Sequence, residues 1–218
     1  MMFDINLFLK AAPTLLQGLG ITFLVTVAAS LIACAGGFLL GLASLSAKKW
    51  LVRSASGFTH VARATPEIIA IFWAYYSLPI LLGANLSGIT CGILALGLIG
   101  AGYMAEIVRG GVLAIGKGQW EAAKSLALPR IIAWTYVVLP QAAKKMLPPT
   151  VNYLADLIKA TTLLAGVGVG ETAYAAYIEG AATYRYLEPL TGVAILFFLM
   201  IFPISLLARR LDGEKKSA

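Results

Sequence analysis

Apolar residues fill five long stretches of the chain, and polar or charged residues gather in the segments between them. A helix rising ~1.5 Å per residue over such a stretch can cross the ~30 Å hydrocarbon core of a bilayer. We therefore expect five transmembrane helices, at about residues 15–46, 56–82, 88–108, 151–169 and 187–208. Residues 1–13 are mixed in character and predict an interfacial helix that ends near Pro13. The pattern indicates an all-α, polytopic membrane protein with one transmembrane domain over residues 1–218 and no internal repeat.

The composition also indicates a membrane protein. Of the 218 residues 60% are hydrophobic and only 12% are charged, which is about half the usual share of charge in a soluble domain. The net charge of +7 could suit nucleic acid, but the basic residues lie in loops between apolar stretches. The positive-inside rule explains them better, so no nucleic-acid partner is expected. Cys34 and Cys91 lie within apolar stretches, which favours small packing residues over a disulfide framework.

Charge in the loops predicts the orientation of the chain. Basic residues are in excess in segments 48–53, 117–145 and 209–216. Segments 83–88 and 170–186 show no such excess. Because cytoplasmic loops of membrane proteins are enriched in Lys and Arg, we expect a periplasmic N-terminus and a cytoplasmic C-terminus in a bacterial inner membrane.

Charged residues within the apolar stretches form three pairs with helical spacing. The pairs are Arg63/Glu67, Glu106/Arg109 and Asp156/Lys159. Ionisable groups in hydrocarbon are costly, so each needs a partner or a water-filled face. For Glu106/Arg109, near the cytoplasmic boundary, we expect a self-neutralising pair. For Glu67 and Lys159, both a neutralising pair and a polar path or ligand site remain open.

Two interruptions mark the candidate path. Pro66 removes a backbone hydrogen bond and should kink the second span, and residues 159–162 place one charge and two hydroxyls within the fourth. The candidate substrate-pathway residues are Arg63, Thr65, Pro66, Glu67, Lys159, Thr161 and Thr162.

No catalytic or metal site is expected. His60, Glu106, Asp156 and the two cysteines show no recognisable catalytic or metal-ligand spacing. The glycines at 166, 168 and 170 lack the preceding strand and the Gly-Lys-Ser/Thr ending of a phosphate-binding loop. If ATP is used, another subunit must bind it.

The polar segment 117–140 lies between two apolar stretches on the basic side of the membrane. Glu121-Ala-Ala is expected to begin a short helix that ends near Ala127. Pro129 is placed to open a second helix, where its missing N–H costs nothing. Such a segment should lie at the cytoplasmic membrane surface and face a soluble partner.

This segment resembles the EAA loop of bacterial ABC importer permeases. It has Glu121-Ala-Ala, three residues, a small residue at 127, nine residues and then Val137-x-Leu-Pro140. Further stretches are similar to the polar amino-acid uptake branch of that family, in the same order along the chain. They are Arg63-Ala-Thr-Pro66, Gly102-Tyr-Met-Ala-Glu-Ile-Val-Arg-Gly-Gly111, Lys117-Gly-Gln-Trp-Glu-Ala-Ala123, Leu139-Pro-Gln-Ala-Ala143 with Leu147-Pro148, and Lys159-Ala-Thr-Thr-Leu163.

The resemblance implies a type I ABC importer fold and a non-enzymatic permease subunit. It would move a polar amino acid or derivative, with a basic amino acid or an opine favoured, from periplasm to cytoplasm. Its partners would be two cytoplasmic subunits that bind ATP and Mg²⁺, a second permease (identical or a sibling) and a periplasmic substrate-binding protein. A coupling helix would lie in a groove of the ATPase, with Glu121 offering charge and Ala122 and Ala123 allowing close approach. The implied coupling residues are Gln119, Glu121, Ala122, Ala123, Ala127, Leu139 and Pro140.

The chain departs from the family pattern at three positions. Position 127 usually holds glycine, so Ala127 either costs roughly 1–2 kcal/mol in a left-handed conformation or lets the first helix run further. Ala160 replaces an aspartate, and Glu67 replaces a more usual apolar residue. We expect Glu67 to meet a substrate ammonium or guanidinium group, and Lys159 or nearby backbone amides to meet a carboxylate. The alternative, that Glu67 only pairs with Arg63, stays open.

A stand-alone secondary transporter or channel is the main competing hypothesis. It predicts uptake without ATPase subunits, and it leaves the EAA-like segment without a purpose. Five helices without an inverted repeat also make a poor stand-alone transporter, because alternating access needs two halves that move against each other.

Overall fold

The computed structural model describes residues 3–213, with side chains described as far as Arg210. Over these residues the chain is helical, with no strand. The elements in chain order are α1 Ile5–Ser44, α2 Lys49–Ala64, α3 Glu67–Tyr76, α4 Leu78–Leu82, α5 Gly88–Leu113, α6 Lys117–Ser125, α7 Arg130–Ile132, the π-helix η1 Ala133–Val138, α8 Leu139–Ala160, the 3-10 helix η2 Thr161–Val167, α9 Thr172–Thr183 and α10 Leu187–Gly213. Lys215 and Lys216, expected to anchor the C-terminal end, lie outside the described residues.

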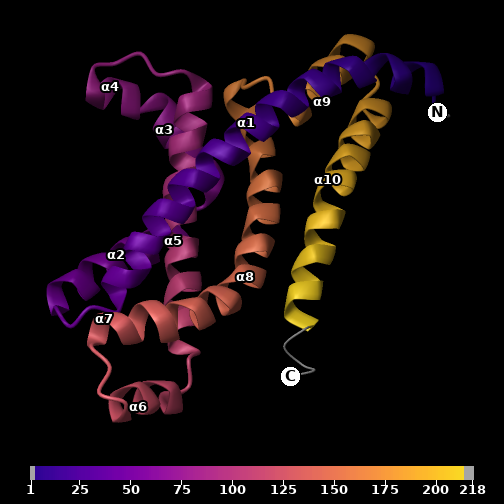
Figure 1. The fold of residues 1–218 in the computed structure, drawn as a ribbon. Helices are drawn as coiled ribbons and strands as arrows, with labels where there is room; N and C mark the ends of the chain where they lie inside the picture. The colour runs from indigo at the N-terminus through magenta and orange to yellow at the C-terminus, as the bar shows by residue number, and fades with distance from the viewer. Residues whose placement is uncertain (1–2, 214–218) are drawn as a thin grey trace.

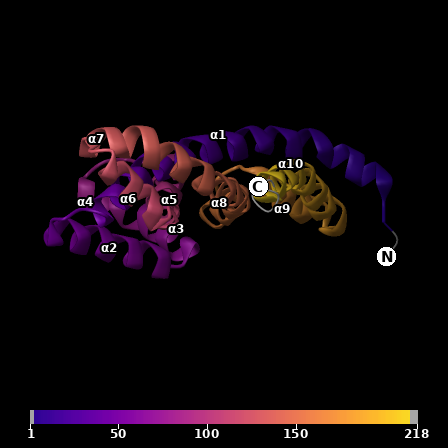
Figure 2. The same ribbon diagram turned by 60° about the horizontal axis from the view of Figure 1, so that its bottom comes forward.

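The long helices run between two ends of the molecule (Figure 1). The start of α1 lies at the upper end together with α9 and the beginning of α10. The short helix α6 lies by itself at the lower end, below the junction of α7 with α8. Figure 2 shows α1 arching along one side of the other helices. The fold therefore separates the N-terminal end of the chain from the EAA-like segment.

Helix α1 is longer than the sequence predicts. Asp4 caps it, because its carboxylate accepts hydrogen bonds from the backbone N–H of Asn6 at 2.9 Å and Leu7 at 3.4 Å. The predicted interfacial helix ending near Pro13 is wrong, because α1 continues through Pro13 to Ser44. A proline inside a membrane helix removes one backbone bond, but packed neighbours tolerate it and the helix bends instead of ending. The curvature of α1 is visible in Figure 2.

The second apolar stretch is not one helix. α2 ends at Ala64, and α3 begins at Glu67. Thr65 and Pro66 between them have extended backbone, with ψ of 124° and 133°. The proline ring disfavours helical geometry at the residue before it, so the predicted kink is a complete break. This break places Glu67 at the first position of a new helix.

The fourth stretch also has different bounds. Its helix, α8, begins at Leu139 and passes through Pro148 and Pro149. It then tightens into η2, which ends at Gly168 with a φ of 72°. The polar segment expected at 170–186 contains the helix α9, capped by the buried carboxylate of Glu171.

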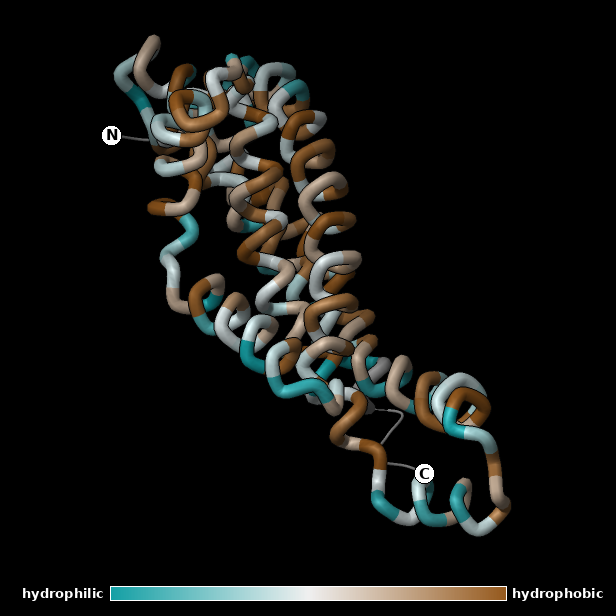
Figure 3. The backbone as a smooth tube through the Cα atoms, turned by 90° about the vertical axis from the view of Figure 1, so that its left-hand side faces the viewer, coloured by the Kyte–Doolittle hydropathy of each residue, from teal (hydrophilic) through white to brown (hydrophobic). Residues whose placement is uncertain are grey.

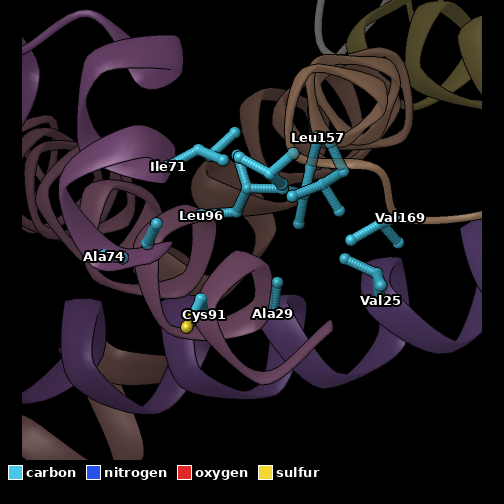
Figure 4. Close-up of a cluster of buried hydrophobic side chains, with 11 residues drawn as sticks. Val25, Ala29, Ile71, Ala74, Cys91, Leu96, Leu157 and Val169 are labelled. Carbon is cyan, nitrogen blue, oxygen red and sulfur yellow. The ribbon is translucent and has the colours of Figure 1, made fainter. Parts of the chain in front are cut away.

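The core lies where α1, α3, α5, α8 and η2 meet. Figure 4 shows Ile71, Leu96 and Leu157 converging from three helices, with Val25 and Val169 facing each other nearby. The cluster is free of charged residues. Cys91 is buried in it, Cys34 is half-buried, and both are free thiols, as their positions in apolar stretches predict.

Two glycines let α1 and α5 pack closely. A Cβ atom at Gly37 would lie 2.2 Å from the Cβ of Met104, and one at Gly41 would lie 2.6 Å from the Cβ of Val108. Real side chains do not approach so closely, so each position requires a hydrogen atom there. The small-residue spacing at 37 and 41 therefore does what such motifs do in membrane helices.

Among the described residues, three helices are long and apolar enough to cross a membrane: α1, α5 and α10. The segment 130–167 together with α9, bent by 46°, would be a fourth, and α3 is a shorter apolar helix. Figure 3 shows hydrophobic residues along the middle of the long helices and hydrophilic residues gathered around the lower end. The structure thus supports a membrane-spanning helical protein.

Candidate functional site

Helix α6 presents two different faces. Glu121, Ala122 and Lys124 are exposed on its outer side. On its inner side Ala123 is only 5% exposed, and the ring of Trp120 lies 5.4 Å from that of Trp134 in an edge-to-face contact. The resemblance to the EAA loop implies that Ala123, like Ala122, lies at the ATPase contact. In the structure Ala123 instead faces the rest of the permease. Glu121 and Ala122 remain available to a partner.

The end of α6 explains the unusual residue at 127. Ala127 has a φ of 52°, in the left-handed region. Its N–H donates to the carbonyl of Lys124 at 2.9 Å, and that of Leu128 donates to the carbonyl of Ala123 at 3.1 Å. These two bonds form a Schellman motif, in which glycine normally occupies the left-handed position. Of the two alternatives for Ala127, the left-handed conformation is the one the chain adopts. A separate helix begins at Arg130, directly after Pro129, as predicted.

Replacing Ala127 with glycine is expected to stabilise the permease by about 1 kcal/mol, since it relieves most of the left-handed strain. This should raise the unfolding midpoint of the detergent-purified protein by about 2–4 °C. The matched control is Ala122→Gly within α6, which should destabilise by about 1 kcal/mol because glycine disfavours a helix interior. A midpoint lowered by both substitutions would contradict the strain at Ala127.

The remaining predicted coupling residues lie at the same end of the molecule. Gln119 is exposed and accepts a hydrogen bond from Nε2 of Gln141 at 3.1 Å. Leu139 and Pro140 form the first turn of α8, directly after the π-helix η1. The EAA-like segment and its continuation thus form one continuous structure below the long helices (Figure 1).

A half-open cavity of about 230 Å³ lies between α3, α5 and α8. Its lining combines two carboxylates, two tyrosines and apolar side chains: Glu67, Leu96, Ile99, Tyr103, Tyr153, Asp156, Leu157 and Ala160. Cavities with a mostly apolar wall and a few convergent polar groups are typical of small-molecule sites. Among the seven predicted substrate-pathway residues, Glu67 is the one that lines this cavity.

Glu67 owes its position to the break at Pro66. Because α2 and α3 are separate helices, Arg63 and Glu67 do not have helical neighbour geometry. No ion pair joins them within the described part of the chain. The guanidinium of Arg63 lies over the ring of Tyr103 instead, 5.6 Å from its centroid. The alternative in which Glu67 is only the partner of Arg63 is therefore wrong.

The other predicted pathway residues have local partners. Nζ of Lys159 lies 2.6 Å from the carboxylate of Asp156. The hydroxyls of Thr161 and Thr162 donate to the carbonyls of Ile158 and Lys159, both at 2.7 Å. The hydroxyl of Thr65, directly after α2, donates to the carbonyl of Val61 in the last turn of that helix at 2.8 Å. The hydroxyls of these three threonines are thus hydrogen-bonded to nearby backbone carbonyls. None of the three residues lines the cavity.

Three cavity residues escaped the sequence analysis as site candidates. The rings of Tyr103 and Tyr153 stack with centroids 5.7 Å apart and an angle of 19° between their planes. The sequence predicts Asp156 as a partner for Lys159 and not as part of a ligand site. Tyr103 falls within the motif at 102–111, whereas nothing in the apolar context of Tyr153 sets it apart. The expected pair Glu106/Arg109 does form, at 2.7 Å.

Comparison with known proteins identifies the chain. Residues 5–216 match the family model described as binding-protein-dependent transport system inner membrane component. The chain belongs to this family. It is 33% identical to the arginine transport system permease protein ArtQ of Bacillus subtilis, over 98% of both chains. It is 32% identical to the glutamine transport system permease protein GlnP of Escherichia coli, over 99% of both chains.

Solved structures agree on the fold. The chain matches the crystal structure of an amino acid ABC transporter with histidines at a TM-score of 0.90 and 31% identity, over 98% of this chain and 100% of that one. An inward-facing structure of the MetNI methionine ABC transporter matches at a TM-score of 0.73 and 21% identity, over 97% of this chain and 99% of that one. The protein is thus a permease subunit of an amino-acid ABC importer with the type I fold. Membership of this family implies an ATPase partner and a substrate-binding protein.

Proposed function

We propose that this permease moves a basic amino acid, or a derivative such as an opine with a cationic group, from the periplasm to the cytoplasm. The observation that supports this proposal is Glu67, a carboxylate without an ion-pair partner in the described structure, on the wall of a cavity lined by aromatic rings. One of the similar permeases is named for arginine, whose guanidinium group suits a carboxylate in bidentate geometry.

The balance of charge around the cavity favours a cation. Asp156 is already matched by Lys159, so this pair contributes little net charge to the wall. Arg63 lies over Tyr103 and not against Glu67. Glu67 is therefore left as the net charge of the lining, and a carboxylate in a low-dielectric wall attracts a cation more strongly than it would in water. The rings of Tyr103 and Tyr153 in the lining add apolar aromatic surface against which a guanidinium can pack.

The carboxylate of the substrate needs a different partner. Lys159 is half-exposed beside Asp156, two residues before the 3-10 helix. We propose that Lys159 exchanges Asp156 for the substrate carboxylate during passage. In this scheme Lys159 and Glu67 bind opposite ends of one amino acid, while Thr161 and Thr162 keep the helix end in place through their backbone bonds.

We further propose five membrane spans: α1, α2 with α3, α5, α8 with η2, and α10. α1 would start at the periplasmic side, and α6 would lie in the cytoplasm, at the opposite end (Figure 1). Two ATPase subunits, which bind ATP and Mg²⁺, would contact two copies of α6, one from this chain and one from a second permease. Only a pair of permeases provides two halves that can rock against each other.

Reversing the charge of Glu121 is expected to weaken binding of the ATPase to the permease. Glu121 is exposed on the outer face of α6, so Glu121→Lys should leave the permease folded and lower the amount of ATPase that co-purifies with it at least about tenfold. A loss of this size corresponds to about 1.4 kcal/mol. The control is Lys10→Glu, which reverses the charge of an exposed residue near the start of α1, at the end of the molecule opposite α6. Equal recovery of the ATPase with both variants would argue against α6 as the coupling helix.

The transported substrate can be tested with the reconstituted complex. Its ATPase activity is measured in proteoliposomes against a panel of binding proteins, each loaded with a basic, a neutral or an acidic amino acid. We expect stimulation by the loaded binding proteins for basic amino acids and ATP-dependent accumulation of the same ligands. Stimulation confined to neutral or acidic ligands would overturn the assignment, and uptake without any ATPase subunit would favour a secondary transporter.

A further inference from the structure

A set of contacts joins α6 to the segment that leads into α8. The rings of Trp120 and Trp134 meet edge to face at 5.4 Å. Next to them Nε2 of Gln141 donates to Oε1 of Gln119 at 3.1 Å. Both contacts bridge two pieces of chain that a loop separates, and η1 is the element against which α6 packs most extensively. Neither contact is needed to form the outer surface of α6 or the wall of the cavity.

Gln141 makes a second bond that extends the link. Its Nε2 also donates to the carbonyl of Val137, at 2.8 Å. Val137 lies within the π-helix η1. A single half-buried amide group therefore connects the coupling helix, the π-helix and the first turn of α8. An apolar side chain of the same size could not make either bond.

The π-helix has a local cause and a structural consequence. The N–H of Leu139 donates to the carbonyl of Trp134, five residues earlier. Pro140 has no N–H, and in a regular α-helix its ring would clash with the carbonyl of residue 136. The wider turn before Pro140 avoids this clash. Trp134, within this π-helix, faces Trp120 of α6, and π-turns within helices are frequent at functional sites.

A third contact attaches the other end of the α6 loop to α8. Nζ of Lys145 donates to the carbonyl of Ala114 at 2.5 Å, at the end of α5. Beneath these polar contacts the buried side chains of Val138 and Ala142 pack with those of Val112 and Ile115. The chain that enters α6 and the chain that leaves it are both held to the beginning of α8.

We infer that Trp134 and Gln141 are positioning residues of the transport cycle. They hold α6, η1 and the first turns of α8 as one unit, so that a displacement of α6 by the ATPase is carried along α8 to the cavity. α8 runs as one helix from Leu139 to Ala160 with Pro148 and Pro149 inside it, and Figure 1 shows it bent, so the path from Gln141 to Tyr153 follows a bent helix. At the far end of that path Tyr153 and Asp156 line the cavity. The inference rests on the proposed function, because it assigns these residues to its coupling step.

The first test measures coupling. Gln141→Leu and Trp134→Leu are introduced separately, and the number of substrate molecules imported per ATP hydrolysed is measured in proteoliposomes with the binding protein present. Each variant should lower this ratio at least about fivefold, which corresponds to about 1 kcal/mol, while the complex assembles with its ATPase as before. Gln17→Leu, the same change at an exposed position of α1, should leave the ratio unchanged.

Rescue separates positioning from a simple loss of stability. The pair Gln119→Glu with Gln141→Lys rebuilds the contact as an ion pair, and we expect it to restore most of the ratio that Gln141→Lys alone loses. If uptake and ATP hydrolysis fall in proportion in Gln141→Leu, or if the pair restores nothing, the link is only structural and the inference fails.

The second test asks whether the two segments move together. Cysteines replace Gln119 and Gln141 in a protein whose native thiols are removed by Cys34→Ser and Cys91→Ala, and a short bis-maleimide joins them. Because the segments form one unit, the cross-linked transporter should retain at least about half of its uptake. Uptake abolished by the cross-link, with the unlinked double-cysteine protein active, would show that α6 and α8 must separate. Were the proposed function itself wrong, the unmodified complex would already lack binding-protein-dependent uptake in both tests.

Discussion

Replacing Glu67 with glutamine is expected to lower uptake of arginine by about 10- to 100-fold, because a hydrogen bond to a charged group contributes about 1.5–3 kcal/mol. The amide keeps the size of the side chain, and no ion pair elsewhere in the described structure depends on this carboxylate. The permease should therefore fold, assemble and respond to its binding protein. The measurement is the initial rate of ATP-driven uptake in proteoliposomes at a fixed concentration of loaded binding protein.

Glu179→Gln is the matched control for this prediction. Glu179 accepts a hydrogen bond from the hydroxyl of Thr14 at 2.7 Å, at the end of the molecule far from α6. A glutamine there can still accept that bond, so uptake should stay within about twofold of the unmodified protein. If Glu67→Gln imported arginine at the wild-type rate, Glu67 would not be part of the substrate path. The proposed preference of the cavity for a cation would then have no basis.

Replacing Gly37 with leucine is expected to prevent α1 from packing on α5. Even the first carbon of the new side chain would lie 2.2 Å from the Cβ of Met104 and 2.9 Å from its backbone carbonyl carbon. These atoms belong to the rigid part of α5, so the two helices would have to move apart. Overpacking of a core by a few methylene groups already costs about 1–3 kcal/mol, and a whole leucine against backbone should exceed that range. We expect the amount of folded permease in the membrane to fall at least tenfold.

Gly20→Leu tests whether this effect is specific. Gly20 lies on the same helix, and a Cβ there has nothing within 4 Å. An added leucine side chain would face outward, and leucine favours a helix more than glycine does. The yield of Gly20→Leu, measured by fluorescence-detected size exclusion, should match that of the unmodified protein. Similar yields for both leucine variants would mean that the approach of α1 and α5 at Gly37 is not required.

The sequence anticipates the parts of the fold that depend on local chemistry. Pro129 lies directly before the start of α7, where its missing N–H is harmless. The EAA-like segment forms a short helix that is followed by the left-handed Ala127, although this helix begins at Lys117 and not at the predicted Glu121. The glycines at 37 and 41 lie against α5, and small residues four positions apart favour such close helix packing in membranes.

The failures occur where tertiary packing overrides a local rule. Pro13 and the pair at 148–149 remain inside helices because neighbours in a membrane protein compensate for lost backbone bonds. Pro66, by contrast, ends its helix. Proline alone does not reveal which outcome applies. The π-helix before Pro140 has no signature in hydrophobic periodicity, because it changes the register of the chain by only one residue.

The candidate site could be predicted only in part for the same reason. Glu67 could be found because a carboxylate after a proline in an apolar stretch is conspicuous. Tyr103 and Tyr153 could not be paired, because their stacking depends on how α5 and α8 pack and not on their spacing in the chain. Lys159 was expected at the ligand but lies against Asp156 one turn away, a local contact that competes with any distant role.

We propose that the cavity beside Glu67 selects a positive charge. The most direct measurement is equilibrium binding of radiolabelled arginine and citrulline to the purified transporter complex without its binding protein, since citrulline has nearly the same shape but no charge on its side chain. We predict that arginine binds at least about tenfold more tightly, a difference of about 1.4 kcal/mol, and that Glu67→Gln removes this preference. Equal affinities for the two amino acids in the unmodified complex would contradict the account.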